Sequence, residues 1–503
     1  MGKLCWSKSL KTVILSKFVE SFTICSMENS INLYESLAND IGGMIKTSVY
    51  RPGERLPSVR HLATQNRMSI STVTQAMRLL QDQGLIDVKP QAGYFVRCRP
   101  RPLKSETHAN DFNTATFVDV NNNQTKILLE NTAGAVIQFG NAWLPDDLLP
   151  TKRLQSVVST VTRTHPNLFN SPGFFNLNEP DFVRQIVRRA ADWGKIDPSE
   201  IVVTNSATEA LSLCLRMVAK PGDTIAIESP CHILMLQLIQ TAGMKALEIP
   251  THPKTGISLE ALELALSGNM VQACMFMPNG SNPLGCIMPD ANKKRLVELM
   301  NQFNVSLIEN DMYGDLCFGA NRPVPAKAYD TQGNVLLCTS YSKTVTSAMS
   351  AGYIMAGKFS HQMIFLKALS SGPASHYNQA VMANMINGSQ YTTHLRMVRR
   401  IMAQRIAQVS DAVTRYFPQS CQISEPQGGF VIWVQLPYPI CTYDIHSRAL
   451  KEGIAFMPGA LFSASGKFGN YLRLNCGNPW DERVELALRR LGELAHDCLN
   501  GGG

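Results

Sequence analysis

The 503-residue chain lacks a membrane-spanning segment, because no apolar run approaches the ~20 residues that a bilayer requires. No secretion signal is expected, since Lys17 and Glu20 interrupt the apolar residues near the N-terminus. Its thirteen cysteines include no C-x-x-C pair and no cluster with histidine at zinc-ligand spacing. The sequence therefore predicts a globular cytoplasmic protein with reduced cysteines, no metal site and no membrane partner.

Positive charge is concentrated at the front of the chain. Residues 1–26 hold four lysines and one glutamate, and residues 27–101 hold ten Lys and Arg against six Asp and Glu. The whole chain has a net charge of only +8, so nearly all of the excess lies where a polyanion such as nucleic acid can bind. Met27 offers a second start, so we interpret residues 1–26 as an extension from a mis-assigned start; a small amphipathic anchor is the alternative.

Three helices and a hairpin are predicted next. Apolar residues at helical spacing over residues 33–45 indicate an amphipathic helix. Ser58 and Ser69 can each cap a further helix, and the apolar runs around the turn at residues 89–93 predict a β-hairpin. This order is typical of a winged helix-turn-helix, whose third helix enters the major groove of DNA while the hairpin touches the backbone.

The exposed face of the third predicted helix carries short polar side chains, among them Ser71, Thr72 and Gln75. Such side chains approach base edges and phosphates closely, which suits a DNA-reading helix. The alternative is a small helical module that docks another protein and leaves this face in solvent. Helical periodicity alone does not separate the two.

The motif R-P-G-E-R-L-P-S-V-R-H-L-A covers residues 51–63, S-I-S-T-V-T-Q-A covers residues 69–76, and G-Y-F-V covers residues 93–96. Over residues 33–97 this text resembles the GntR family of bacterial transcription regulators. The resemblance implies that the arginine of the P-S-x-R step contacts phosphate or base and that the third helix reads the groove. The DNA-binding residues it implies are Arg60, Ser69, Ser71, Thr72, Gln75 and Gly93.

After the hairpin the composition changes. Residues 99–134 open with R-P-R-P and include an Asn/Gln run, which is typical of a linker. From residue 135 apolar runs alternate with helical stretches, which predicts an α/β domain with a mostly parallel sheet. The predicted organisation is extension 1–26, winged helix 27–98, linker 99–134 and a large domain 135–503 that includes a small C-terminal subdomain.

Polar residues follow four of the apolar runs, at the strand ends where such sheets bind ligands. They are Ser206-Ala207-Thr208, Asn282, the group Asn310, Asp311 and Tyr313, and Lys343 with Ser340 and Ser342. A lysine packed at a strand end has its pKa lowered and can attack an aldehyde, while neighbouring hydroxyls and helix amides hold a phosphate. The alternative for Lys343 is a surface lysine in a Ser/Thr-rich turn.

This order of loops resembles the fold-type I pyridoxal-phosphate enzymes of the aspartate aminotransferase superfamily over residues 137 to about 495. Because the GntR-like residues 33–97 precede this domain, the whole chain resembles the MocR subfamily of GntR regulators. The resemblance implies that pyridoxal 5′-phosphate forms a Schiff base with Lys343 and that Arg473 holds a substrate carboxylate. The cofactor-binding residues it implies are Lys343, Ser340, Ser342, Ser206, Ala207, Thr208, His232, Asn282, Asn310, Asp311 and Tyr313.

Three positions depart from that pattern. Ser350 stands where the family has an arginine on the phosphate, which removes a charge-assisted contact. Asn310 stands where an acid pairs with the ring nitrogen, with Asp311 beside it as a substitute if the turn shifts. His232 stands where a tyrosine stacks on the ring.

The first interpretation is therefore a transcription regulator that binds an operator in double-stranded DNA. Its aminotransferase-like domain would bind pyridoxal 5′-phosphate and an amino acid or amine as effector. Two alternatives remain: a working transaminase, and a cofactor-free body that only dimerises. All three predict a homodimer, because aminotransferase sites form at dimer interfaces.

Overall fold

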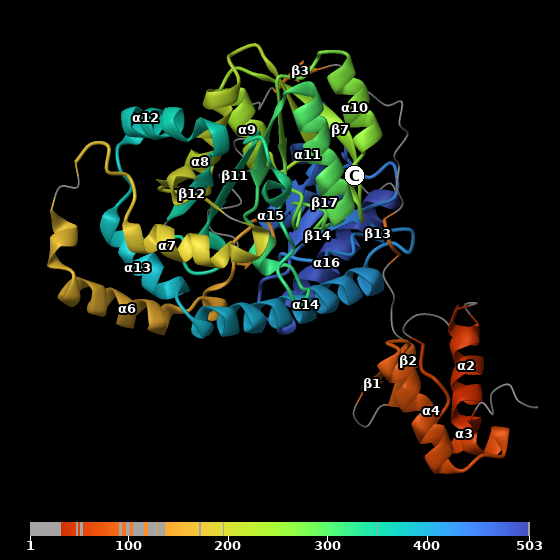
Figure 1. The fold of residues 1–503 in the computed structure, drawn as a ribbon. Coiled ribbons are helices and arrows are strands. Elements are labelled where there is room, and N and C mark those ends of the chain that lie inside the picture. The colour runs from red at the N-terminus through yellow and green to blue at the C-terminus, as the bar shows by residue number, and fades with distance from the viewer. Residues whose placement is uncertain are drawn as a thin grey trace, which may run out of the picture. The chain divides into compact units, whose positions relative to one another are not determined.

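The computed structural model describes residues 32–46, 49–50, 54–89, 93–96, 101–103, 115–118, 127, 136–170, 173–194, 196–349 and 351–500. The predicted extension 1–26, Arg51, the hairpin turn at residues 90–92, most of the linker and Ser350 lie outside these ranges. The chain forms two compact units, Met1–Arg99 and Pro100–Gly503, which are described separately (Figure 1). No helix among the described residues is long and apolar enough to cross a membrane.

The first unit has the predicted order of elements. It contains α2 (Leu33–Lys46), α3 (Val59–Asn66), α4 (Ile70–Asp82) and the antiparallel hairpin of β1 (Ile86–Lys89) and β2 (Gly93–Val96). The side chain of Ser58 accepts a hydrogen bond from the amide of His61, and that of Ser69 accepts one from the amide of Thr72. Both predicted caps are therefore confirmed.

The core of the first unit explains why the polar face of α4 is exposed. Val73, Ala76, Met77 and Leu80 are fully buried and pack with apolar residues of α2, α3 and the hairpin. These four positions recur at helical spacing, so the polar positions between them must face away from the core.

The second unit is built on a nine-stranded sheet with the order β3-β7-β6-β9-β10-β11-β12-β5, to which β8 adds on β7. The strands are β3 (Thr116–Phe117), β5 (Ile201–Thr204), β6 (Thr224–Ser229), β7 (Lys245–His252), β8 (Gly256–Ile257), β9 (Ala273–Phe276), β10 (Ser306–Asn310), β11 (Val335–Ser340) and β12 (Gly352–Met355). From β7 to β11 all neighbours are parallel, and β12 runs antiparallel to both of its neighbours. The predicted mostly parallel α/β sheet is confirmed.

Helices cover both faces of this sheet (Figure 1). On one face lie α8 (Ala207–Val218), α9 (Ile233–Thr241) and α12 (Ser360–Ser371). On the other lie α6 (Thr151–Thr164), α7 (Pro180–Arg189), α10 (Leu259–Ser267), α11 (Asp290–Phe303) and α13 (His376–Ile386). Alternate residues of one strand enter different cores, as Leu307 and Ile308 do, because successive side chains of a strand point to opposite faces.

A smaller subdomain follows the long helix α14 (Ser389–Tyr416). Its four-stranded sheet has the order β13-β14-β17-β16. The elements are β13 (Gln422–Ile423), β14 (Val431–Gln435), β16 (Met457–Pro458), β17 (Tyr471–Asn475), α15 (Thr442–Lys451) and α16 (Glu482–Leu499). A short strand, β15 (Ile454–Ala455), pairs in parallel with β4 (Ile137–Gln138), so the residues that follow the linker are anchored to this subdomain.

The described pieces of residues 99–134 lie against the second unit. The amide of Ile423 donates to the carbonyl of Arg101, β3 pairs with β7, and Ile127 is buried beside Trp433. Composition did not indicate the two main-chain contacts, because main-chain pairing places no demand on side chains.

Candidate functional site

Lys343 ends a short 3-10 turn (Tyr341–Lys343) directly after β11. Its Nζ donates a hydrogen bond to the carbonyl of Ala142 at 2.5 Å and lies 3.5 Å from the ring centroid of Trp143. Burial lowers the pKa of Lys343 to about 7, and the positive charge of Arg473 acts in the same direction. A large share of the amine is therefore unprotonated at neutral pH, which is its nucleophilic form.

Arg473 lies in β17 and is almost fully buried. Its Nη2 donates to the carbonyl of Gly140 and, at 2.9 Å, to that of Asn141. Its Nε is buried without a hydrogen-bond partner among the described residues. Residues 140–143 thus contact the Lys343 amine and the Arg473 guanidinium, and we call residues 139–143 the cover segment.

Unsatisfied polar groups gather around the same place. Six buried side-chain N or O atoms of the described residues lack a partner, and three of them belong to Asn282, Asn310 and Arg473. Asn282 donates from Nδ2 to the hydroxyl of Tyr313 at 3.3 Å, and Asn310 donates only to the sulfur of Met235 at 3.7 Å. A buried group without a partner costs about 1–3 kcal/mol, so three at predicted ligand-binding positions point to a polar ligand.

The phosphate-binding residues expected from the sequence meet at the start of α8. They are Ser206, Ala207, Thr208, Ser340 and Ser342. Ser206 caps α8, and the hydroxyls of Ser340 and Ser342 lie 2.8 Å apart. Ser340 pairs with Gly352, where an added Cβ would lie 2.8 Å from the carbonyl carbon of Ser206. This close approach brings the strand pair that carries Ser340 next to the N-terminus of α8. Serine hydroxyls and helix amides together suit a phosphate.

His232 caps α9, and its Nδ1 accepts a hydrogen bond from the amide of Leu234 at 3.3 Å. Burial lowers the pKa of His232 to about 3, and the charges of Arg473 and Lys343 act in the same direction. The imidazole is therefore neutral in the physiological range. A neutral ring beside Lys343 can stack on a planar ligand without repelling the lysine.

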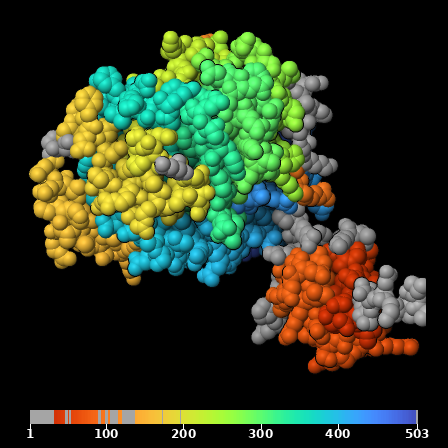
Figure 2. Space-filling model, in the orientation of Figure 1, coloured from red at the N-terminus to blue at the C-terminus, as the bar shows by residue number. Residues whose placement is uncertain are grey.

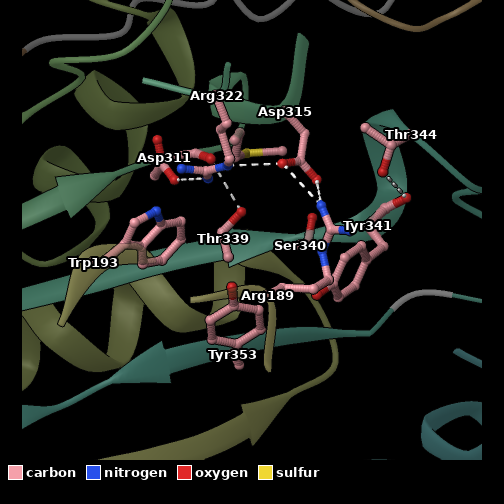
Figure 3. Close-up of a pocket in the computed structure, with 11 residues that line it drawn as sticks. Arg189, Trp193, Asp311, Asp315, Arg322, Thr339, Ser340, Tyr341, Thr344 and Tyr353 are labelled. Atoms are coloured by element: carbon pink, nitrogen blue, oxygen red, sulfur yellow. Dashed lines mark hydrogen bonds and ion pairs between the residues drawn. The ribbon is translucent and has the colours of Figure 1, made fainter. Parts of the chain in front are cut away.

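Asp311 faces a small cavity that Ser340 also lines. Its carboxylate forms an ion pair with Arg322 and accepts a hydrogen bond from Asn279 at 3.2 Å. Arg322 also bonds Asp315 at 2.7 Å. Figure 3 shows Asp311, Arg322 and Asp315 around this cavity. Its volume of about 20 Å³ is room for one water molecule. For Asp311 to replace the missing acid at position 310, this ion pair would have to break.

Strand geometry explains why the side chains of Asn310 and Asp311 point in different directions. Asn310 is the last residue of β10 and its side chain points toward Met235 of α9. Asp311 follows directly and points to the opposite face of the sheet, where Arg322 lies. No sequence pattern indicated Arg322, because its pairing depends on how a loop returns to the sheet.

The predicted DNA-reading residues lie on the surface of the first unit. Arg60 is exposed on α3, and Ser71 and Gln75 are exposed on α4. The hydroxyl of Ser69 lies 2.7 Å from that of Ser71 and 2.8 Å from that of Thr72. These hydroxyls therefore form one cluster at the start of α4, where a recognition helix first meets DNA.

Arg55, which lies beside the hairpin, is a positively charged residue that the sequence analysis did not select. Gly93 has φ +107°, a conformation that favours glycine, and its open side faces the guanidinium of Arg55. Arg55 also forms a β-bridge with Phe95. The exposed Arg55 thus lies at the wing, beside the predicted backbone-contacting glycine.

Two family models match the chain. Bacterial regulatory proteins, gntR family, matches residues 33–96, and aminotransferase class I and II matches residues 152–491. The uncharacterized HTH-type transcriptional regulator YdcR of Escherichia coli (strain K12) is 35% identical over 93% of this chain and 99% of its own length. YjiR of the same strain, an uncharacterized HTH-type transcriptional regulator, is 33% identical over 93% of this chain and 99% of its own length.

Solved aminotransferase structures match about three quarters of the chain. Pyrococcus horikoshii kynurenine aminotransferase, in complex with PMP, matches with a TM-score of 0.69 at 22% identity over 75% of this chain and 95% of that chain. LysN, the α-aminoadipate aminotransferase of Thermus thermophilus, matches with a TM-score of 0.68 at 22% identity over 76% of this chain and 96% of that chain. At this level of identity the two structures establish the fold.

Proposed function

Because the chain belongs to the gntR family of bacterial regulatory proteins, in the MocR-like form with an aminotransferase class I and II body, we propose that it regulates transcription. The first unit binds an operator in double-stranded DNA. The second unit binds pyridoxal 5′-phosphate and uses it to sense an amino compound. A protein that binds bacterial chromosomal DNA works in the cytoplasm.

The exposed polar face of α4 supports the DNA-binding half. Its buried positions fill the core, so Ser71, Thr72 and Gln75 remain for base edges and phosphates. Arg60 on α3 supplies a positive charge near the same helix. No described residue of this face belongs to the core, so the face is accessible to DNA.

Arg60→Ala tests this half. Losing one phosphate contact should weaken operator binding. It should also reduce the slope of log affinity against log salt by about 0.9 for each DNA-binding unit. Lys294→Ala is the matched control, because it removes an equal charge from the exposed face of α11. Equal salt slopes for both variants and the wild type would contradict a phosphate role for Arg60.

The combination of a buried lysine with a pKa of about 7 and three unsatisfied polar side chains is the observation that supports cofactor binding. When bound, pyridoxal 5′-phosphate supplies an aldehyde that a primary amine can capture and a ring that withdraws electrons. Lys343 provides the amine. Asn282 and Tyr313 would hold the ring oxygen, and Arg473 would hold a carboxylate.

Asn310 favours sensing over catalysis. A carboxylate at this position would keep the ring nitrogen protonated, whereas an amide has no negative charge to do so. The Asp311 carboxylate is held by Arg322 on the other face of the sheet and does not replace it. If the cofactor binds here, its ring would be a weak electron acceptor, which would suit reversible capture of an amine.

An absorbance spectrum tests cofactor binding. The protein with added cofactor should show a visible band that is absent from Lys343→Ala and retained in Lys254→Ala, which alters an exposed lysine on the same unit. A wild-type protein that stays colourless with excess cofactor would overturn the proposal and favour a body that only dimerises.

A working transaminase is the second candidate, and the presence of both Lys343 and Arg473 favours it. Amino transfer from an amino acid to a keto acid distinguishes the two. We expect slow transfer in the wild type and faster transfer in Asn310→Asp, which restores a carboxylate at that position. A wild type that turns over at the rate of an ordinary transaminase would favour the enzyme.

We also propose that a second copy of this chain covers an exposed aromatic surface. Phe169, Phe174, Phe175, Phe365 and Leu369 are each more than half exposed, which is unusual for neighbouring apolar side chains. The rings of Phe175 and Phe365 stack at 6.1 Å. Phe365 and Leu369 belong to α12, and Phe169 stacks on Tyr377 of α13. In Figure 2 the segment that follows α6 lies beside α12.

Sedimentation of Phe175→Asp tests the dimer. A charge in the middle of a buried apolar interface should shift the wild-type dimer toward monomer, while Leu486→Asp on exposed α16 should not. A dimeric operator site with two half-sites one helical turn apart would agree with a two-fold protein. A wild type that sediments as a monomer would refute the proposal.

A further inference from the structure

The first residue of α4 is a large apolar side chain on the surface of the first unit. Ile70 is 57% exposed, although Val73 and Met77 of the same helix are fully buried. Exposure alone assigns it no role, because single exposed apolar side chains are common on protein surfaces. The other exposed large apolar residues described in this unit are Leu33, Met44, Val49 and Val88. Ile70 differs from them in its position on α4.

That position is the end of α4 that a recognition helix presents to bases. In helix-turn-helix proteins the N-terminal residues of this helix contact base edges in the major groove. Side chains of a helix tilt toward its N-terminus, so the side chain of Ile70 leans out beyond the first turn. Ile70 lies directly before the exposed Ser71, at the edge of the polar face. A base pair that meets the start of α4 therefore meets Ile70.

Two of the hydroxyl groups around Ile70 are engaged with the protein itself. Ser69 Oγ accepts from the amide of Thr72 at 3.1 Å and lies 2.7 Å and 2.8 Å from the hydroxyls of Ser71 and Thr72. A hydroxyl has one proton and two lone pairs, so these three partners use its whole capacity. The hydroxyl of Thr74 donates to the carbonyl of Ile70 at 2.8 Å. Neither Ser69 nor Thr74 has a proton left for a base edge.

Thymine is the base that offers an apolar group in the major groove. Its C5 methyl projects there, whereas the other three bases present hydrogen-bond donors and acceptors. An apolar side chain that contacts this methyl removes both surfaces from water, which is favourable. Ile70 cannot bond a donor or acceptor, and covering one would leave it unsatisfied. At the position that it meets, Ile70 therefore favours thymine.

We propose that Ile70 is a specificity-determining residue of the DNA-binding unit and that it contacts the C5 methyl group of a thymine in the operator. This inference rests on the DNA-binding half of the function proposed above. Removing one methyl group from water strengthens binding about fourfold for each thymine contacted.

Replacing thymine by deoxyuridine tests the contact, because it removes the methyl group and leaves the hydrogen-bonding edges of the base in place. The probe is the duplex that the full-length wild type selects from a randomised library. Each thymine of this duplex is replaced in turn, and the affinities of the wild type and Ile70→Ala are measured at one salt concentration. Ile70→Ala should fold normally, because Ile70 lies outside the core and alanine is the best helix former.

At one or more thymines, deoxyuridine should weaken binding of the wild type about fourfold and leave the affinity of Ile70→Ala almost unchanged. The variant has already lost the contact, so the two losses do not add. Leu33→Ala is the matched control, because it shortens an exposed apolar side chain on α2 and should keep the fourfold loss. A loss of equal size in the wild type and Ile70→Ala would assign the effect to DNA shape and overturn the contact.

Failure of this inference differs from failure of the proposed function. A wild type that selects a defined duplex, none of whose thymines distinguishes it from Ile70→Ala, would overturn the thymine contact and leave operator binding standing. A wild type that enriches no sequence from the library would overturn operator binding, and the thymine contact with it.

Discussion

The pH dependence of Lys343 reactivity is the most direct consequence of its surroundings. Its ordinary pKa is 10.5, and burial together with the charge of Arg473 lowers it to about 7. At pH 7 about half of the buried amine is neutral, compared with about one part in three thousand for an unperturbed lysine. Capture of an aldehyde should therefore be about a thousandfold faster than for an exposed lysine of equal access.

Capture is followed by stopped-flow absorbance after cofactor is mixed with cofactor-free protein. The rate should rise tenfold per pH unit below about pH 6.5 and level off above about pH 8, because the neutral form is then saturated. Pyridoxal lacks the phosphate and should give the same midpoint, which assigns the titration to the protein. Arg473→Gln should move the midpoint upward, because a positive neighbour has been removed.

The same shift affects stability. Because the pKa is lower in the folded state, the unfolded chain binds more protons between about pH 7 and pH 10.5. The free energy of unfolding should therefore rise with pH across this window by up to about 1.4 kcal/mol per unit, relative to Lys343→Met. Two results together would refute a lowered pKa of Lys343. They are a capture rate that still rises tenfold per pH unit above about pH 9, and a free energy of unfolding with the same pH dependence in the wild type and in Lys343→Met.

Three further outcomes follow from contacts elsewhere. Arg322→Met should lower the free energy of unfolding by about 3–5 kcal/mol in urea titration, because it leaves Asp311 as an unpaired buried charge, and adding Asp311→Asn should recover part of the loss. Ser69→Ala should destabilise the first unit by about 1 kcal/mol through loss of the α4 cap, and an unchanged thermal midpoint for that unit would contradict the cap. Gly352→Ala should weaken cofactor binding and leave DNA binding intact, because its Cβ would push on the backbone at the start of α8; unchanged affinity for the cofactor would contradict this packing.

Local patterns determined the first unit. Apolar spacing placed α2 and α4, and the serine caps placed the starts of α3 and α4, since each signal involves residues within one or two turns of a helix. Alternating apolar runs also predicted the strands of the large sheet and hence the edge at which Asn282, Asn310 and Lys343 lie. In a parallel sheet, position at a strand end follows from chain order.

Tertiary structure alone decided what surrounds those side chains. The hydrogen bond between Lys343 and Ala142 joins residues 201 positions apart, and that between Arg473 and Gly140 joins residues 333 apart. No periodicity or motif encodes such a contact, because it depends on how the start of the domain packs on its C-terminal subdomain. The sequence thus determined which chemical groups reach the site, and packing determined that Trp143 covers the lysine and that Asp311 faces away from Asn310.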